Sequence, residues 1–504
     1  MGHLLMVESW VGAMSRLLPR AITEAGHTFT FLTRDLQHYL RSAPEGVEHP
    51  LLGARHVLTA DTNDVPALLP HVADLHAALR FDGVLSSCDY YLPAVAGIAE
   101  HLGLPGPSAR SVTTACRKDR TRRALEAAGL PGPRFAVCDG FAAAAVAAQE
   151  VGYPLVFKPV DLCAGMFVRR VDDEAQLAEA HRALDAFPVN ARGQLRSPAV
   201  LLEELLDGPE VSVETVSFGG VTRAVGVTDK SVGGAPAFIE TGHMFPAGLG
   251  SEETAAAVET AVAAVSGLGL DQVVAHTEIK LTSAGPRVVE VNPRPAGNRI
   301  TELVRHVTGI DLAGACVDLA LGREPDLATR STGVRSAAIG FLLPRQDGVL
   351  EGYEVGQERP DGLTEARAHV PAAVPGDVAD GEWAAVPGAV PDGERAAVPG
   401  EVREGGQGDA SDEAHGSGRG GTTGGATPTP AEDAASEVRS GVAGLESLPG
   451  VLEVRLAEPG VRVRASGDNN GYLGHIMAAD AEGGGARDRV AELLATVRPR
   501  VAAR

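Results

Sequence analysis

The segment HTEIKLTSAGPRVVEVNPRPAGNRITELV, residues 276–304, carries the clearest pattern in the chain. Two runs that alternate apolar and polar residues flank a short Ala-Gly turn, which predicts a two-stranded antiparallel ribbon. Because side chains alternate across a strand, Glu278 and Glu290 can face each other, with Asn292 on the same side. Carboxylate and amide oxygens suit Mg²⁺, with nucleotide phosphates completing its coordination. The pattern indicates a magnesium site, although a solvated hairpin edge would show the same acidic residues.

Two neighbouring features add positive charge to this ribbon. Arg294 follows Asn292 by two residues, where it can meet a transferring phosphoryl group or a carboxylate. In GYPLVFKPVDLCAGMFVRRV, residues 152–171, a strand carries Lys158 toward a loop with Ala164 and Gly165. A lysine beneath a small-residue loop is suited to holding nucleotide phosphates through backbone N–H groups. The motif GxxxxGK[ST] occurs nowhere, so this is not a Walker loop.

A third feature is LLEELLDGPEVSVE, residues 201–214, at the end of a predicted strand. An adenine needs a backbone donor and acceptor in an apolar slot, and the following run can offer them: Glu203, Glu204, Leu205 and Leu206. Glu210 can accept hydrogen bonds from ribose hydroxyls, and Lys118 can supply a second ammonium for the phosphates.

Lysine usage is a further signal, because only four of the 44 basic residues are lysine. They are Lys118, Lys158, Lys230 and Lys280. Such a bias indicates a GC-rich coding sequence that favours arginine, so a retained lysine is either chance or a place that needs a compact ammonium. Lys230 has no assigned role, and Lys280 alternates onto the face of Glu278 and can pair with it.

Composition excludes several classes of protein. The net charge of −22 argues against nucleic acid as the main partner. No apolar run reaches the roughly 18–20 residues of a membrane span. The N-terminus lacks a basic region and is predicted to be a strand rather than an export signal. Five dispersed cysteines suit a reducing cytoplasm without a disulfide framework.

The 504 residues predict several packed units of mixed α/β (α+β) class. Strands alternating with helices over 1–110 predict a parallel α/β domain, without the glycine-rich dinucleotide fingerprint. The predicted units are 1–110, a small subdomain at 111–200, a large subdomain with the metal site at 201–330, and a C-terminal α/β unit formed by 331–355 with 437–504.

An insertion at 356–436 is predicted to interrupt the C-terminal unit. AAVPG recurs there with a 12-residue period, and residues 351–440 carry a net charge of about −12. Such low-complexity sequence has too few large apolar residues to offset chain entropy, so we expect an acidic disordered segment.

Taken as a set, these motifs resemble the ATP-grasp superfamily over about residues 1–345 and again over 441–500. Within it the chain is most similar to the L-amino acid ligase (dipeptide synthetase, bacilysin-type) branch of natural-product biosynthesis. The stretches that carry this resemblance are FDGVLSSCDYYLPAVAGIAEHLGLPG, KPVDLCAGMFVRRV, FIETGHMFPA and VEVNPRPAGNRITELV.

The resemblance implies a role for each matched residue. ATP phosphates would contact Lys118, Lys158 and the Ala164–Gly165 loop, and adenine would lie against Glu203 to Leu206. Glu278 and Glu290 would ligate magnesium, with Asn292 joining a second ion, and Mn²⁺ could substitute. Arg294 would stabilise the acyl phosphate and the tetrahedral intermediate. Glu240 and His243 fall at substrate-recognition positions, where an ordinary loop histidine is the alternative for His243.

Two departures and one open point accompany the resemblance. Asn298 stands in the substrate pocket, where the bacilysin-type enzyme has a bulkier residue, so specificity is open. The low-complexity insertion has no counterpart in the family pattern. A homodimer is compatible with this chain.

Three functional hypotheses follow. The first is a ligase that activates an amino acid or related carboxylate as an acyl phosphate and joins it to an amine, releasing ADP and phosphate. The second is a biotin-carboxylase-like or purine-pathway enzyme that activates bicarbonate or formate. The third is a nucleotide-binding regulator without catalysis, which the complete set of acids and Arg294 disfavours.

Overall fold

The N-terminal part forms a four-stranded parallel sheet, as the sequence predicts. The computed structural model describes residues 1–10, 13–40, 49–233, 237–356, 441–465, 469 and 471–503. The sheet has the order β3-β2-β1-β4 and consists of β1 (His3–Val7), β2 (Thr28–Thr33), β3 (His56–Thr59) and β4 (Gly83–Leu85). Its helices are α1 (Met14–Glu24), α2 (Leu36–Leu40), η1 (Pro50–Gly53), α3 (Val65–Leu79), η2 (Asp89–Tyr91) and α4 (Leu92–Leu102). Because β1 lies between β2 and β4, the connections diverge at the carboxyl ends of β1 and β4, where parallel sheets open a crevice.

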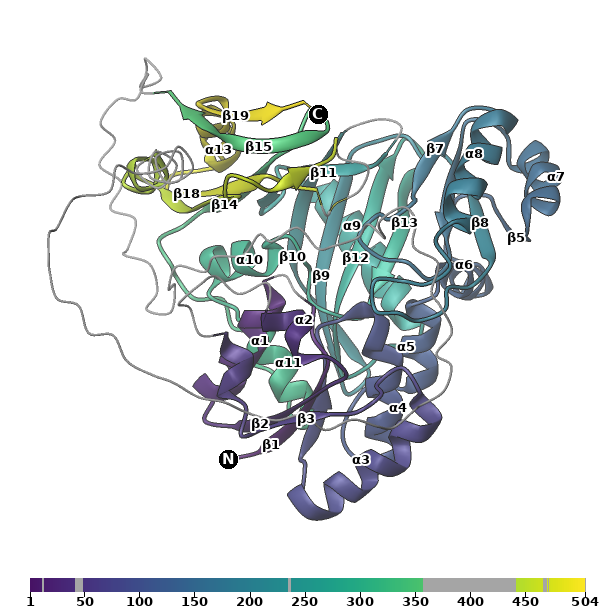
Figure 1. Cartoon of the computed structure of the whole chain (residues 1–504), viewed down its shortest axis with the longest axis vertical. Helices are drawn as coiled ribbons and strands as arrows, with labels where there is room; N and C mark the ends of the chain where they lie inside the picture. Colours follow the sequence, from purple (N-terminus) through teal and green to yellow (C-terminus); the bar gives the residue numbers. More distant parts are fainter. Residues whose placement is uncertain are drawn as a thin grey trace, which may run out of the picture.

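The next part is an antiparallel sheet covered by helices, in the upper right of Figure 1. Two helices lead into it, α5 (Ala109–Ala115) and α6 (Lys118–Ala127). The sheet has the order β5-β8-β6-β7 and consists of β5 (Phe135–Asp139), β6 (Leu155–Pro159), β7 (Arg169–Val171) and β8 (Ala199–Glu204). Apolar side chains of α7 (Phe141–Val151) and α8 (Glu174–Asp185) pack on this sheet in one core. This sheet therefore presents Lys158 and the β6–β7 loop on a separately packed body.

A large sheet forms the centre of the molecule in Figure 1. Its order is β13-β12-β9-β10-β11-β14-β18-β16. The first five of these are β9 (Glu210–Phe218), β10 (Val221–Gly233), β11 (Ile239–Phe245), β12 (Val273–Thr282) and β13 (Gly285–Asn292). Helix α9 (Ser251–Gly267) buries its alanine-rich side against these strands, and α10 (Ile300–Thr308) packs beside β11 and β14. Helix α11 (Leu312–Ala320) instead packs on α1 of the N-terminal part.

The C-terminal part is joined to the central sheet through β-strand pairing. Its strands β14 (Ser336–Leu342), β18 (Gly474–Asp480) and β16 (Val451–Leu456) continue the central sheet, because β14 pairs with β11. A second, small sheet follows, with β15 (Gly348–Val355), β17 (Arg462–Val463) and β19 (Val497–Ala502). Helix α13 (Ala486–Ala495) crosses closely over β14, where a β-carbon at Gly340 would lie 2.5 Å from Cδ1 of Leu494.

Two findings concern membrane spans and cysteines in the described ranges. No helix there is long and apolar enough to span a membrane. All five cysteines are free. The predicted insertion at 356–436 lies outside the described residues apart from its first residue, Gly356. The division into units at the predicted boundaries stays a prediction.

The two described ends that flank residues 357–440 meet in space. A β-carbon added at Gly441 would lie 2.7 Å from Cγ2 of Val355. We therefore expect that replacing 357–440 by a short Gly/Ser linker keeps the fold. The entropic cost of closing a loop grows only logarithmically with its length. The shorter linker should therefore raise the free energy of unfolding by no more than about 2 kcal/mol. Urea denaturation of the two proteins measures this, and a loss of stability on deletion would contradict it.

Candidate functional site

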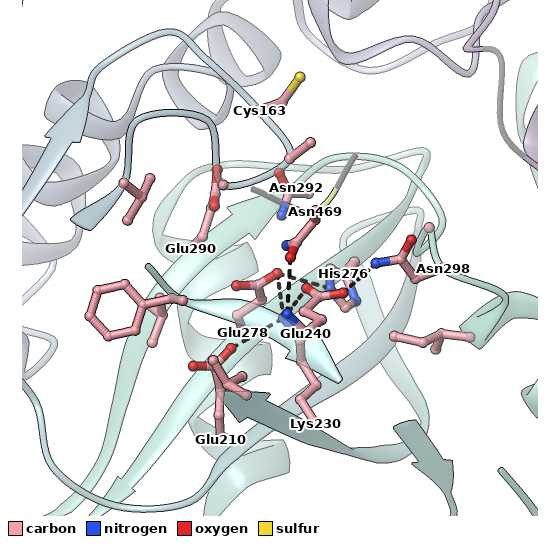
Figure 2. A pocket seen from close by; sticks show the side chains of 18 of the residues that line it. Cys163, Glu210, Lys230, Glu240, His276, Glu278, Glu290, Asn292, Asn298 and Asn469 are labelled. Carbon is pink, nitrogen blue, oxygen red and sulfur yellow. Dashed lines mark hydrogen bonds and ion pairs between the residues drawn. The ribbon is translucent and has the colours of Figure 1, made fainter. Parts of the chain in front are cut away.

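The predicted ribbon forms as expected and pairs its acidic residues directly. Glu278 of β12 is the register partner of Glu290 of β13, and Asn292 is the partner of His276. The turn lies between Thr282 and Gly285. Figure 2 shows Glu278, Glu290 and Asn292 reaching toward the same cavity. The prediction that these three oxygen-bearing side chains share one face is confirmed.

A cavity of about 270 Å³ brings the predicted site together. Its lining contains every predicted site residue except His243: Lys118, Lys158, Ala164, Gly165, Glu203, Glu204, Leu205, Leu206, Glu210, Glu240, Glu278, Glu290, Asn292, Arg294 and Asn298. His243 is 2% exposed and lies behind Glu240, with Nε2 3.1 Å from that carboxylate. The four lysines of the chain all line this cavity, which supports the interpretation that their compact ammonium groups are needed there.

Lys158 is held by a buried carboxylate that the sequence did not single out for this purpose. Its Nζ lies 2.6 Å from Glu203, and the Arg122 guanidinium pairs with the same carboxylate. Arg122 also donates to the Val288 and Val289 carbonyls, at 2.6 and 2.7 Å. Burial opposes ionisation of Glu203, but the two cations outweigh it and lower its pKa to about 2. The side chain of Glu203 therefore positions Lys158, and only its backbone remains available to a ligand.

Lys118 and the β6–β7 loop line the cavity beside Lys158. The Lys118 ammonium lies 2.8 Å from Glu290 and donates to the Leu162 carbonyl at 2.6 Å. Ala164 and Gly165 both have positive φ, of 55° and 69°, which turns the loop back on itself. A left-handed conformation is uncommon for alanine, and such strain is found often at ligand-binding loops.

Lys230 occupies the centre of the cavity, a position that sequence analysis missed. Its Nζ lies 2.8 Å from Glu278, 3.1 Å from Glu240 and 3.2 Å from Glu210 (Figure 2). Burial alone would lower the pKa of Lys230, but these three carboxylates hold it well above its ordinary value. Lys280, which the sequence left unassigned, pairs with Glu210 at 3.3 Å. The lysine bias was the only sequence signal for Lys230.

Glu240 is surrounded by groups that keep it ionised. Burial opposes its charge, but the Lys230 ammonium, with hydrogen bonds from His243 and Asn298, holds the pKa of Glu240 well below its ordinary value. Its backbone N–H donates to Asn469 Oδ1 at 2.9 Å, so the C-terminal part reaches this position. Asn298 has a positive φ of 48°, which places its amide against the Glu240 carboxylate.

Two further partners orient the ribbon and its arginine. Asp89 of the N-terminal part accepts a hydrogen bond from Arg294 Nε at 2.6 Å. His276 contacts Glu214 through Nδ1 at 2.8 Å and Glu278 through Nε2 at 3.3 Å. Burial would lower the pKa of His276, yet the two carboxylates raise it to about 9. His276 is therefore an imidazolium at neutral pH and helps to fix the Glu278 carboxylate.

The ribbon fits a metal ion that arrives with a phosphate ligand. No group of three or more His, Cys, Asp and Glu residues in the described part of the chain can hold a metal by itself. Glu278, Glu290 and Asn292 supply hard oxygen donors but too few for a complete Mg²⁺ shell. The remaining positions need phosphate oxygens and water.

Comparison with protein families agrees with this arrangement. Residues 151–302 match the ATP-grasp domain and residues 20–106 match the ATP-grasp N-terminal domain. The chain contains ATP-grasp domains. Residues 423–502 match the L-amino acid ligase C-terminal domain 2, so the predicted similarity to that branch is confirmed as well.

Three curated proteins are similar in sequence to this chain. Protein y4rH of Sinorhizobium fredii, which is uncharacterized, is 32% identical over 64% of this chain and 63% of its own length. Carnosine synthase 1 of Homo sapiens is 33% identical over 50% of this chain and 32% of its own length. Alanine–anticapsin ligase of Bacillus amyloliquefaciens is 29% identical over 51% and 57%. The chain thus spans less than two thirds of each of these relatives.

A solved structure of a related enzyme can be superposed over the full length of this chain. The L-amino acid ligase of Bacillus licheniformis superposes with a TM-score of 0.68 at 20% identity, over 100% of this chain and 99% of that one. The predicted ATP-grasp fold is therefore confirmed.

The adjacent residues Glu203 and Glu204 provide a matched test of the buried ion pair. Glu203→Gln should cost about 3 kcal/mol of unfolding free energy, because Arg122 and Lys158 would share a buried site without a counter-charge. Glu204 is half exposed and pairs with the exposed Arg134, so Glu204→Gln should cost less than about 1 kcal/mol. Urea unfolding of both variants measures the difference, and equal losses would contradict the assignment.

Proposed function

We propose that this chain is an ATP-dependent carboxylate–amine ligase that forms an amide or dipeptide with release of ADP and phosphate. The observation that carries the proposal is the arrangement of two charged sets in one cavity. Lys118, Lys158 and Arg294 offer positive charge for phosphates, whereas the ionised Glu240 offers negative charge for an ammonium group. The names of two relatives, alanine–anticapsin ligase and carnosine synthase, support the same class of reaction.

ATP would bind at the end of the cavity that the small sheet covers. Lys118, Lys158 and the Ala164–Gly165 loop would hold its phosphates. The backbone from Glu203 to Leu206, where β8 ends, would receive the adenine. Glu210, fixed by Lys230 and Lys280, would accept from the ribose hydroxyls.

Magnesium would bind between Glu278 and Glu290, with Asn292 joining a second ion. When bound, the metal neutralises charge on the β- and γ-phosphates during transfer. Two ions, and substitution by Mn²⁺, are part of this proposal. Lys118 and Lys230 now pair with Glu290 and Glu278, at 2.8 Å in each case, and would remain beside the phosphates as further positive charge.

Arg294 would act on the reacting groups. A substrate carboxylate takes the γ-phosphoryl group and becomes an acyl phosphate, while ADP leaves. An amine then attacks the carbonyl carbon, a proton is lost from nitrogen, and phosphate departs. Asp89 orients the Arg294 guanidinium, which offers preorganised charge to the transferring group and to the tetrahedral intermediate.

The substrates would be small molecules, at least one of them an amino acid. Glu240 would bind its ammonium group, with His243 holding the carboxylate of Glu240 from behind. Asn298 would line the part of the cavity that receives the substrate side chain. A homodimer and a cytoplasmic location stay predictions.

Phosphate release against a panel of amino acids, singly and in pairs, tests the proposal. We expect release that depends on one amino acid and rises with a second amine, and mass spectrometry should find the amide product. Release that needs bicarbonate or formate but no amino acid would favour the alternative enzyme class. Nucleotide binding without turnover under any condition would favour the regulator.

Substitutions of Glu290 and Lys158 separate the metal and phosphate roles. Glu290→Gln should lower turnover at least 100-fold, because it removes a ligand charge, while the fold is kept. Lys158→Met should raise the dissociation constant for ATP at least tenfold, about 1.4 kcal/mol. Arg330, which is exposed and pairs with Asp326, is the control, and Arg330→Met should change neither quantity. Calorimetry and phosphate release measure both, and wild-type turnover by Glu290→Gln would contradict the metal assignment.

A further inference from the structure

The segment between α8 and β8 forms a short turn that reaches from the small sheet to the N-terminal part. Asn190 organises this turn, because its side-chain oxygen accepts from the backbone N–H groups of Arg192 and Gln194 at 2.9 and 3.1 Å. Its amide nitrogen donates to the Gln194 side chain at 2.8 Å, and its backbone N–H donates to the Gln194 carbonyl at 2.9 Å. The tip of the turn therefore presents Arg192 in one conformation.

Arg192 is inserted at the carboxyl end of the N-terminal parallel sheet. It is 8% exposed, and its Nη2 donates to the carbonyl of Ser9, which follows β1. Its guanidinium lies 5.2 Å from the centre of the Tyr39 ring. The Arg192 carbonyl accepts from Asn63 Nδ2 at 2.9 Å. The carboxyl end of a parallel sheet ordinarily receives a ligand, and here a side chain from another part of the same chain docks there.

A continuous path of contacts leads from Arg192 to Arg294. Ser9 Oγ lies 3.0 Å from Ser87 Oγ, and Ser87 Oγ also accepts from the backbone N–H of Trp10 at 3.0 Å. Two residues after Ser87, Asp89 accepts from Arg294 Nε at 2.6 Å. Ser87, Trp10 and Asp89 all line the cavity.

The same turn makes a second contact beside Asp89. Gln194 Nε2 donates to the carbonyl of Tyr90 at 3.3 Å. Residues 87–90 are therefore fixed at both ends by the turn, at Ser87 through Arg192 and Ser9, and at Tyr90 through Gln194.

We infer that Arg192 is a positioning residue that couples docking of the small sheet to the orientation of Arg294. The small sheet also carries Lys158 and the Ala164–Gly165 loop. Arg294 is therefore held in its orientation only when these phosphate-binding groups cover the cavity. Arg192 contacts backbone carbonyl and aromatic groups rather than reacting atoms, and it acts through Asp89. The inference rests on the proposed ligase function.

Arg192→Met tests this with Arg196→Met as the matched control. Arg196 lies in the same segment, but among the described residues its side chain donates to carbonyls within its own part, those of Leu184, Phe187 and Ser197. We expect Arg192→Met to lower kcat at least tenfold and to change the calorimetric ATP dissociation constant less than threefold. Arg192→Lys should restore part of kcat, because an ammonium can also donate to the Ser9 carbonyl. Arg196→Met should keep both quantities within threefold.

A double substitution tests the path itself. If Arg192 acts through Asp89, then Arg192→Met added to Asp89→Asn should lower kcat no further than the worse single change. Fully multiplicative losses would overturn the inference. Should Arg192→Met fail to fold by circular dichroism, Gln194→Met takes its place in the same comparison. This change removes the contact to the Tyr90 carbonyl together with the hydrogen bond from Asn190 Nδ2.

Trp10 provides a readout that does not depend on turnover. Trp10 and Trp383 are the two tryptophans, so Trp383→Phe leaves Trp10 as the sole emitter. We expect a magnesium complex of a non-hydrolysable ATP analogue to change Trp10 emission in this background and in Arg196→Met, but not in Arg192→Met. An equal change in Arg192→Met, or no change in any protein that binds the analogue, would overturn the inference alone. Absence of analogue binding in the parent protein by calorimetry would overturn the proposed function together with it.

Discussion

The ammonium of Lys230 lies between three carboxylates in the middle of the cavity, and the rest of the site depends on this cluster. Removing four charges from water is costly, and such a cluster persists only where each group finds a partner at hydrogen-bond distance. Lys280 and the His276 imidazolium complete the neutralisation on either side. With Glu214 included, four carboxylates face three cations, so an excess negative charge remains. A metal ion or an ammonium group that enters the cavity would offset that charge.

The same kind of contact joins parts of the chain that fold around different cores. Arg122 of α6 binds Glu203 of the small sheet and two carbonyls of β13, and Lys118 binds Glu290. Asp89 of the N-terminal part binds Arg294 at the end of the ribbon. The Arg122–Glu203 and Asp89–Arg294 pairs each join two packed bodies, whereas Lys118 and Glu290 lie on α6 and β13, which share one core. Geometry at the reacting atoms is therefore set by how these bodies dock.

Periodicity was sufficient for the parts of the fold that depend on local pattern. Alternation over 276–292 predicts the ribbon and the shared face of Glu278 and Glu290, because the side-chain period of a strand is two residues. Strand–helix alternation predicts the parallel N-terminal sheet. The predicted C-terminal α/β unit left open how its strands pair, and the structure shows that β14, β18 and β16 extend the central sheet. The alternation of residues along a strand shows which face of that strand is buried, but it does not show which sheet the strand joins or which neighbouring strand it pairs with.

The amino-acid sequence by itself determined the ribbon and the parallel sheet, because spacing reports local preference. Composition singled out the four lysines but did not place Lys230 in the cavity. Only the tertiary structure decided which acid each cation meets. Lys230 is about 50 residues from Glu278 along the chain, and Arg294 is about 200 residues from Asp89. Long-range charge pairing has no period that a sequence can display, since it arises when separately packed bodies dock and leave each buried charge with the partner that lies within reach.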